Sequence, residues 1–189
     1  SLGGTATRFR YNYRAFSNQR IAWGGGHGQS SVQSFDLHND TSDIEIIKMY
    51  LRLECPSGGC DPWDRYANIM VRDKTTNEWF EIGRHITPYG VDNNKLTRGL
   101  EFDVTDFKSL LEGNVELRIF VETWVSSGWI VSLEFDYTPG TPDYKYYKVS
   151  RIIQFNGNSL GGVPYGGLNG NTEIDLEKFD LIKSLQIGS

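Results

Sequence analysis

Two short stretches of the sequence place an aromatic ring next to a carboxylate. Trp63 directly precedes Asp64, and Glu122 is followed by Thr123 and Trp124. Aromatic rings stack on the apolar faces of sugars, while carboxylates accept hydrogen bonds from hydroxyl groups and transfer protons. The two stretches are therefore candidates for a sugar-binding site with acid–base chemistry. The alternative, which the pattern by itself favours, is that both tryptophans are core or rim residues and both acids are solvated.

Other kinds of active site find less support in the sequence. A nucleophile elbow of the Gly-x-Ser-x-Gly type is absent. The glycine-rich stretch at 24–31 fits neither the dinucleotide-binding nor the phosphate-loop spacing, and no convincing helix follows it. We therefore expect neither a serine or cysteine nucleophile nor a phosphate-binding loop.

The two cysteines predict a disulfide rather than a metal site. Cys55 and Cys60 have four residues between them, and His27, His38 and His85 show no spacing that would complete a set of four zinc ligands. Closing so short a loop stabilises a protein by only roughly 2 kcal/mol, so we expect the bond mainly to make this segment rigid. A disulfide also indicates an oxidising compartment, so the protein is expected to be secreted or periplasmic.

The composition narrows the fold class and the partners. The chain has 189 residues, of which 21 are glycine and 13% are aromatic. This richness in rings and turns favours an all-β protein over a helical one. The net charge of −5 argues against a nucleic-acid partner, which would need a basic face. No apolar run reaches the roughly 20 residues of a membrane-spanning helix, so no membrane partner is expected.

Alternation of apolar and polar residues predicts most of the strands. The segments with this alternation are 47–55, 65–73, 74–86, 100–104 and 114–125, with a Thr-Thr-Asn turn between the second and the third. Two further strands are expected around the Pro-Gly-Thr-Pro turn within 130–155.

One short helix is predicted at 105–113. Thr105 or Asp106 would cap its start, and Gly113 would end it. Together with six or more strands, this helix predicts an all-β fold, either an antiparallel jelly roll or a β-sandwich, with one short helix.

The predicted strand at 114–125 has two unlike faces. Its apolar residues, which are expected to point into the core, are Val115, Leu117, Ile119 and Val121. The opposite face ends in Glu122 and Trp124, where a solvent-facing strand usually carries simple charges. This ending repeats the acid-and-ring pairing of Trp63 and Asp64.

Four stretches carry a more specific resemblance. They read CPSGGCDPWDRYANIMVRDKTTNEWFEIGRHITPYGV, LTRGLEFDVTDFKSLLEGNVELRIFVETW, GTPDYKY and GGVPYG. Together they resemble the amino-terminal half of the peptide:N-glycosidase F family. The resemblance runs in order from about Ile47 to Gly166. It is weak before residue 44 and cannot be followed after Gly166.

The resemblance implies both a fold and an activity. The fold is an antiparallel jelly-roll domain at 1–168, normally the first of two that pack side by side. Residues 169–189 would then be a linker and a possible first strand of a second domain that is absent from this chain. The family hydrolyses the amide bond between asparagine and the first N-acetylglucosamine of N-linked glycans, and it uses no metal or organic cofactor. N-glycoproteins or glycopeptides with a chitobiose core are the expected substrates.

The resemblance also assigns the site residues. Asp64 matches the essential aspartate of the Cys-Asp-x-Trp-Asp-Arg motif and is expected to hold or activate the attacking water. Glu122 matches a supporting glutamate and is expected to tune that carboxylate or bind the sugar. Positions that match the family in or near its chitobiose-binding cleft are Trp63, Arg65, Tyr66, Tyr89 and Trp124. Arg65 is expected to offset charge or polarise an oxygen, and Cys55 and Cys60 match a family disulfide.

The family places its cleft between two domains, and its second domain brings a further catalytic acid. We therefore expect little activity from this chain alone, and we expect a second jelly-roll domain or fragment as its partner. The favoured prediction is an N-glycan amidase domain. The alternative is a jelly-roll module that binds carbohydrate without turnover.

Overall fold

The computed structural model describes residues 8–145 and 148–149. This part of the chain forms nine strands and one 3-10 helix. The elements are β1 (Tyr11–Arg14), β2 (Gln19–Ile21), β3 (Ser30–Asp36), β4 (Ile44–Glu54), β5 (Tyr66–Arg72), β6 (Trp79–Ile86), β7 (Leu100–Asp103), η1 (Thr105–Leu110), β8 (Asn114–Val121) and β9 (Trp129–Pro139). The described residues up to Lys148 group into one compact unit. The predicted domain boundary between 168 and 169 lies outside the described residues.

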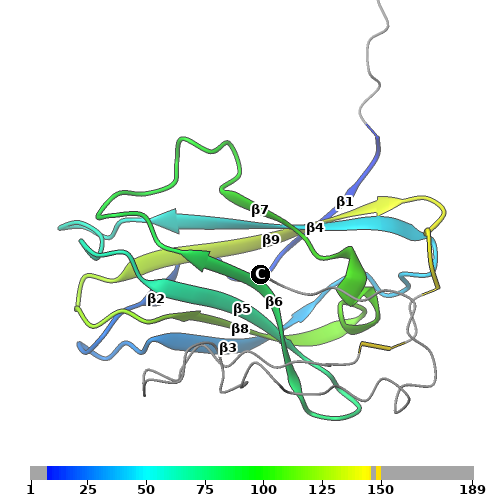
Figure 1. The fold of residues 1–189 in the computed structure, drawn as a ribbon, viewed down its shortest axis with the longest axis horizontal. Helices are drawn as coiled ribbons and strands as arrows, with labels where there is room; N and C mark the ends of the chain where they lie inside the picture. Colours follow the sequence, from blue (N-terminus) through cyan, green and yellow to red (C-terminus); the bar gives the residue numbers. More distant parts are fainter. Residues whose placement is uncertain (1–7, 146–147, 150–189) are drawn as a thin grey trace, which may run out of the picture. The chain divides into compact units, whose positions relative to one another are not determined.

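The strands pair into two sheets that lie one above the other in Figure 1. The first has the order β1–β9–β4–β7, with β2 also paired to β9, and the second has the order β3–β8–β5–β6. Each of these described pairs is antiparallel. The predicted fold class, an antiparallel jelly roll or β-sandwich with one short helix, is confirmed.

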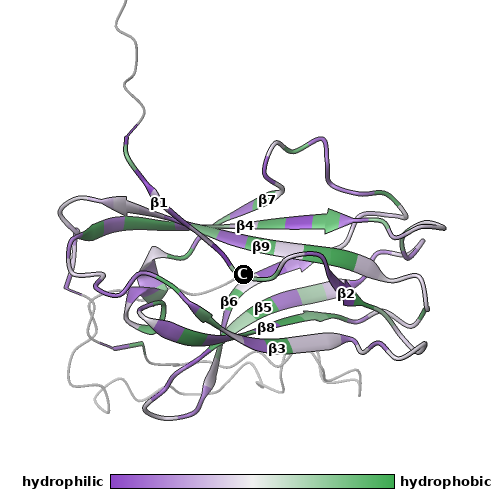
Figure 2. Ribbon diagram, turned by 180° about the vertical axis from the view of Figure 1, so that it is seen from behind, coloured by the Kyte–Doolittle hydropathy of each residue, from purple (hydrophilic) through white to green (hydrophobic). Residues whose placement is uncertain are grey.

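The core lies between the sheets and follows the predicted alternation. The inward-facing residues predicted for β8, which are Val115, Leu117, Ile119 and Val121, are buried, as are Ile47, Met49, Leu51 and Leu53 of β4. Apolar and polar colours follow one another along these strands in Figure 2. Removing one such side chain from water stabilises a fold by about 1.5–3 kcal/mol, so this alternation determines which face of each sheet becomes the inner one.

The sequence does not predict β1, β2 or β3. These strands have few apolar residues and are mostly exposed or half-buried. They form because their backbones pair with β9 and β8. β3 begins inside the glycine-rich stretch at 24–31, which the sequence suggests is a loop. The strand predicted after the Pro-Gly-Thr-Pro turn lies largely outside the described residues.

The predicted helix exists as a 3-10 helix, but it ends at Leu110 instead of at the predicted Gly113, and its predicted cap is wrong. The residue before the first turn is Val104, and no side chain caps the helix. The Thr105 hydroxyl instead accepts a hydrogen bond from the Ile47 N–H at 3.0 Å and donates to Asp103 at 2.6 Å. That oxygen therefore ties η1 to β4 instead of capping the helix. Because η1 has six residues, the described part of the chain holds no helix that could cross a membrane.

The predicted Thr-Thr-Asn turn joins β5 to β6. The Asp73 N–H donates to the Glu78 carbonyl oxygen at 2.8 Å, and the Asp73 carboxylate accepts the Thr75 N–H at 2.8 Å. Asn77 has a φ of 62°, a left-handed conformation that asparagine tolerates better than most residues. The turn lies at the end of the sheet where Arg72 pairs with Trp79.

A half-buried histidine of β6 faces the opposite sheet. His85 pairs with the fully buried Ala67 in the register of β5 and β6, and its ring centroid lies 6.4 Å from that of Phe102 in the opposite sheet. Burial lowers the pKa of His85 from 6.5 to about 4, because the charged imidazolium loses its water there. The folded protein therefore holds this side chain neutral.

Acidification is expected to destabilise the fold through His85. Between its unfolded pKa of 6.5 and its folded pKa of about 4, the unfolded chain binds a proton that the folded chain does not. Stability is therefore fully present above the unfolded value, and it is lost as the pH falls through this window, by up to about 3 kcal/mol. Urea unfolding at a series of pH values measures the loss. In His85→Phe this contribution should disappear, and an unchanged pH slope in that variant would refute it.

Candidate active site at one end of the sandwich

Four connections between strands meet at one end of the sandwich. They are 22–29, 55–65, 87–99 and 122–128, and we call this end the loop end. The strand registers require this arrangement, because antiparallel partners bring the end of one strand beside the start of the next. The pairs that border the loop end are Ile21–Trp129, Ser30–Phe120, Leu51–Leu100, Glu54–Ile130, Tyr66–Ile86 and Ala67–Val121. The same loops gather on the left of Figure 1.

Backbone hydrogen bonds order these four loops into a row. Loop 87–99 is bonded to loop 55–65, since the Gly90 N–H donates to the Asp61 carbonyl oxygen at 3.1 Å. Loop 55–65 is bonded to loop 122–128 by the Asp61 N–H and the Gly128 carbonyl oxygen, at 3.0 Å. Loop 122–128 is in turn bonded to loop 22–29. There the Trp23 N–H donates to the Val125 carbonyl oxygen at 2.9 Å.

Each loop of the row carries an exposed aromatic side chain. In the order of the loops these are Tyr89, Trp63, Trp124 and Trp23, with exposed fractions of 62%, 58%, 49% and 50%. Large rings that remain half exposed on adjacent loops are characteristic of a binding surface, because monomeric proteins rarely leave such patches uncovered. The sequence predicted the first three as site residues. It did not predict Trp23, whose only signal is its position before the glycine-rich stretch.

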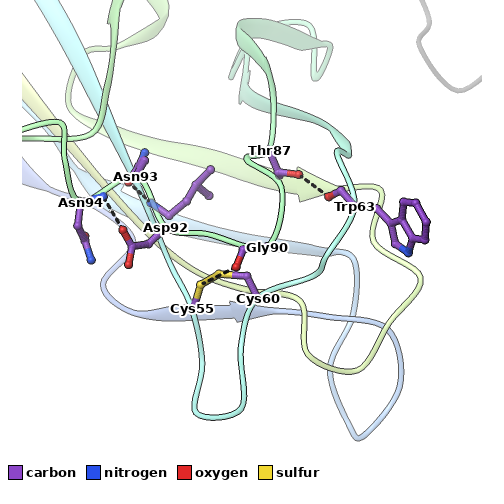
Figure 3. The surroundings of a disulfide bond; sticks show 9 residues. Cys55, Cys60, Trp63, Thr87, Gly90, Asp92, Asn93 and Asn94 are labelled. Carbon is purple, nitrogen blue, oxygen red and sulfur yellow. Dashed lines mark hydrogen bonds between the residues drawn. A yellow bond between two sulfur atoms is a disulfide. The ribbon is translucent and has the colours of Figure 1, made fainter.

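The predicted disulfide is confirmed. Cys55 and Cys60 are bonded, with their Cα atoms 4.4 Å apart. The turn between them uses Gly58 and Gly59, whose φ angles of 100° and 105° suit glycine. The Gly90 carbonyl oxygen lies 4.0 Å from the Cys55 sulfur, so the bond also abuts the neighbouring loop. Figure 3 shows the Trp63 side chain pointing away from the disulfide.

A buried carboxylate organises the segment after the disulfide. Asp61 is 0% exposed. It accepts hydrogen bonds from the Arg65 Nε at 2.7 Å, the Thr123 hydroxyl at 2.6 Å and the Trp63 N–H at 3.0 Å. Burial acts to raise the pKa of Asp61, but these bonds and the charge of Arg65 outweigh it, so the pKa lies below that of an ordinary aspartate. Asp61 therefore joins loop 55–65 to loop 122–128 as a charged group.

The structure places the predicted residue Arg65 against this carboxylate. Its guanidinium forms the ion pair with Asp61, its side chain is only 19% exposed, and its N–H donates to the Thr87 hydroxyl at 2.8 Å. Sequence reasoning missed Asp61, although its place four residues before Arg65 in the same motif was an available signal. The predicted contact of Arg65 with substrate stays a prediction, and its observed role is to hold the loop that carries Asp64.

The two predicted carboxylates lie on adjacent loops. Asp64 is exposed, and a hydrogen bond from the Tyr89 hydroxyl, together with the charge of Asp64, raises the pKa of Tyr89 above its usual value. Glu122 is half-buried, and its N–H donates to the Tyr66 carbonyl oxygen at 2.9 Å, two residues beyond Asp64. An exposed carboxylate that interacts with a phenol, with a second acid on the adjacent loop, can orient and deprotonate a water molecule.

Tyr66 lies on a strand instead of a loop. Its hydroxyl donates to Glu81 at 3.1 Å and accepts a hydrogen bond from Asn68 at 3.0 Å, and the Arg84 guanidinium lies 5.4 Å from its ring centroid. The ring therefore belongs to a polar cluster on the outer face of the four-stranded sheet, next to the row. Among the described residues, no group of three or more histidine, cysteine, aspartate or glutamate side chains is placed to hold a metal ion.

Comparison with known proteins identifies the domain. Residues 66–137 match the family described as peptide-N-glycosidase F, N terminal. A curated relative, peptide-N(4)-(N-acetyl-beta-D-glucosaminyl)asparagine amidase F of Elizabethkingia miricola, is 51% identical over 168 residues, which cover 86% of this chain and 48% of the relative. The chain belongs to the peptide-N-glycosidase F family. It spans about half the length of the relatives that it matches.

Solved structures agree with this membership in the peptide-N-glycosidase F family. That of PNGase F, a glycosylasparaginase from Flavobacterium meningosepticum, matches with a TM-score of 0.79 and 51% identity over 85% of this chain and 52% of that one. The structure of PNGF-II matches with a TM-score of 0.56 and 15% identity over 74% of this chain and 35% of that one. The second likeness is one of fold alone.

Proposed function

We propose that this chain is the amino-terminal domain of an amidase that releases N-linked glycans from glycoproteins. The bond cleaved is the one between the asparagine side chain and the first N-acetylglucosamine. The observation that carries the proposal is the row of exposed aromatic side chains with Asp64 in its middle, in a chain that is 51% identical to a protein named as such an amidase. Rings beside carboxylates suit a sugar attached to a hydrolysable bond.

The proposed reaction adds water to the amide carbon of the asparagine side chain. Asp64 takes a proton from the water and the leaving nitrogen receives one as the carbon–nitrogen bond breaks, so that the nitrogen departs with the sugar as a glycosylamine and asparagine becomes aspartate. The Tyr89 hydroxyl interacts with Asp64 and would keep that carboxylate oriented. Glu122, on the next loop, would bind the sugar or tune Asp64. The ion pair of Asp61 and Arg65 holds loop 55–65 in place.

The aromatic rings would bind the chitobiose core. Trp63 and Trp124 lie on the two loops, 55–65 and 122–128, that a backbone hydrogen bond joins, and each is about half exposed. A half-exposed indole keeps one face available for stacking on a pyranose. We propose that these two rings position the first two sugars against Asp64.

The proposal includes a second domain. The chain spans about half of the relatives it matches, and an exposed row at one end of a sandwich is open on its far side. We propose that the second half of the enzyme closes the site and supplies a further acid. We also propose a secreted or periplasmic location, which the disulfide supports.

A carbohydrate-binding module without turnover is the second candidate. The observation in its favour is that two of the exposed indoles, Trp23 and Trp124, contact each other with ring centroids 4.8 Å apart. Such a platform binds a sugar without any acid. Release of the glycan separates this candidate from the amidase.

The test is incubation of the chain with an N-glycopeptide in water enriched in heavy oxygen, alone and with the carboxy-terminal half of a family member. We expect release in the combined sample, with heavy oxygen in the new aspartate detected by mass spectrometry. Saccharide binding without release in either sample would favour the binding module. Neither binding nor release would overturn both candidates.

A further inference from the structure

One aromatic side chain of the row has no place in the proposed reaction. Trp23 lies in loop 22–29, two loops away from the loop that carries Asp64. Its ring is 50% exposed, and its centroid lies 4.8 Å from that of Trp124 with the two ring planes tilted by 58°. Trp23 therefore continues the line of proposed sugar-binding residues by one ring beyond Trp124.

The order of the loops distinguishes two sides of the proposed site, one for the glycan and one for the polypeptide of the substrate. On one side of loop 55–65 lies loop 87–99, which exposes the apolar residues Val91 and Leu96 as well as Tyr89. On the other side lie loop 122–128 and then loop 22–29. Only this second side presents indoles beyond the acids. Since pyranose rings stack on indole faces, this second side suits the glycan and the first side suits the polypeptide.

Trp23 is fixed in place although its loop is rich in glycine. Its N–H donates to the Val125 carbonyl oxygen at 2.9 Å, and the Gln29 side chain donates to the Thr123 carbonyl oxygen at 2.7 Å. At Gly128 an added Cβ would lie 2.7 Å from the Ala22 Cα, so the two loops approach at backbone contact. The backbone that carries the ring therefore loses little freedom when the ring binds a ligand.

The space next to Trp23 is open. The following residues, Gly24, Gly25 and Gly26, have φ angles of 83°, 64° and 83°, and a Cβ built on any of them would meet nothing within 4 Å. The hairpin is closed by the His27 N–H, which donates to the Gly24 carbonyl oxygen at 3.2 Å, and the His27 side chain is exposed. The backbone that follows Trp23 therefore leaves room for a ligand, and the exposed imidazole of His27 lies on the same loop.

We propose that Trp23, together with Trp124, forms a further sugar subsite that binds a hexose of the glycan beyond the first two N-acetylglucosamines. The inference rests on the proposed function and names a specificity-determining residue for it. Trp23 stacks on the third sugar, and Trp124 borders that sugar as well as holding the first two together with Trp63. The subsite is formed by this chain alone, so it works without the second domain.

The experiment is a titration of the whole chain with two saccharides, chitobiose and the mannose-extended core of N-glycans, followed through the NMR signals of the tryptophan indole N–H groups. Wild-type protein should bind the extended core more tightly than chitobiose. Trp23→Ala should weaken binding of the extended core by about fivefold to tenfold and leave chitobiose binding unchanged. Trp23→Phe should restore most of the loss, because it keeps a ring.

A matched control comes from the opposite end of the sandwich. Phe9 and Tyr11 also form an exposed pair, with ring centroids 4.9 Å apart, so Phe9→Ala should change neither affinity. Equal weakening of both saccharides in Trp23→Ala, or no weakening of either, would overturn the distal subsite. So would an indole signal of Trp23 that shifts on addition of the carboxy-terminal half without sugar. Glycan release by the combined halves would still support the proposed function in each case.

Discussion

Asp64→Asn is expected to lower glycan release by roughly a thousandfold or more in the enzyme completed by its carboxy-terminal half, because a positioned general base contributes about 10²–10⁴-fold to such a reaction. Asparagine keeps the size of the side chain and an oxygen that can accept the bond from Tyr89, but it cannot take a proton from water. Because Asp64 is exposed, the free energy of unfolding should stay unchanged. Single-turnover release from a denatured glycoprotein measures the effect.

The control for this substitution is Asp92→Asn. Asp92 is an exposed aspartate on loop 87–99, whose carboxylate accepts the Asn94 N–H at 2.9 Å. The change removes one negative charge from the same end of the sandwich and keeps an acceptor for that bond. Near-normal turnover is expected. If Asp64→Asn retained as much activity as Asp92→Asn, Asp64 would not be the base.

Asp61→Ala is expected to have the largest effect on stability, about 3–5 kcal/mol, because removing one partner leaves a buried charge without compensation. The guanidinium of Arg65 would lose its partner, and the Thr123 hydroxyl and the Trp63 N–H would lose their acceptor. Loops 55–65 and 122–128 would then separate at their side-chain contact. Urea unfolding gives the free energy, and saccharide affinity gives the effect on the site.

The difference in unfolding free energy between wild type and Asp61→Ala depends on pH with a definite sign. The folded pKa of Asp61 lies below its unfolded value, so its contribution is present above about pH 4 and is lost as the pH falls through the folded pKa. The gap between wild type and Asp61→Ala should narrow accordingly in acid. Lys48→Ala, which breaks an ion pair with Glu101 at 3.5 Å between partly exposed side chains, should cost less than about 1 kcal/mol. Equal costs for Asp61→Ala and Lys48→Ala would contradict the role of Asp61.

Strands with a strong apolar alternation could be predicted from the sequence, and so could the disulfide. β4 and β8 bury the predicted faces because period-two alternation leaves one solution for each strand. The spacing of Cys55 and Cys60 likewise allows little else. Their prediction needed no knowledge of distant contacts.

The features that could not be predicted depend on residues far apart in the chain. β1 and β3 have little apolar pattern of their own and exist through pairing with β9 and β8. The burial of Asp61 becomes visible only when loop 122–128 brings Thr123 to it. The role proposed for Trp23 can be inferred only from its contact with Trp124, about a hundred residues later in the sequence. The family resemblance identified Asp64 and Glu122, and the fold shows that they stand on adjacent loops.

The turn between β5 and β6 lies at the other end of the sandwich from all four loops of the row. Its backbone hydrogen bonds are made within the turn itself, by Asp73, Thr75 and Glu78, and the Lys74 side chain donates one to the Glu112 carbonyl oxygen at 2.9 Å. A fluorophore, a purification tag or a surface anchor attached between Thr75 and Thr76 would therefore leave the loop end facing away from the support. That single attachment point would present every molecule to its glycoprotein in the same orientation.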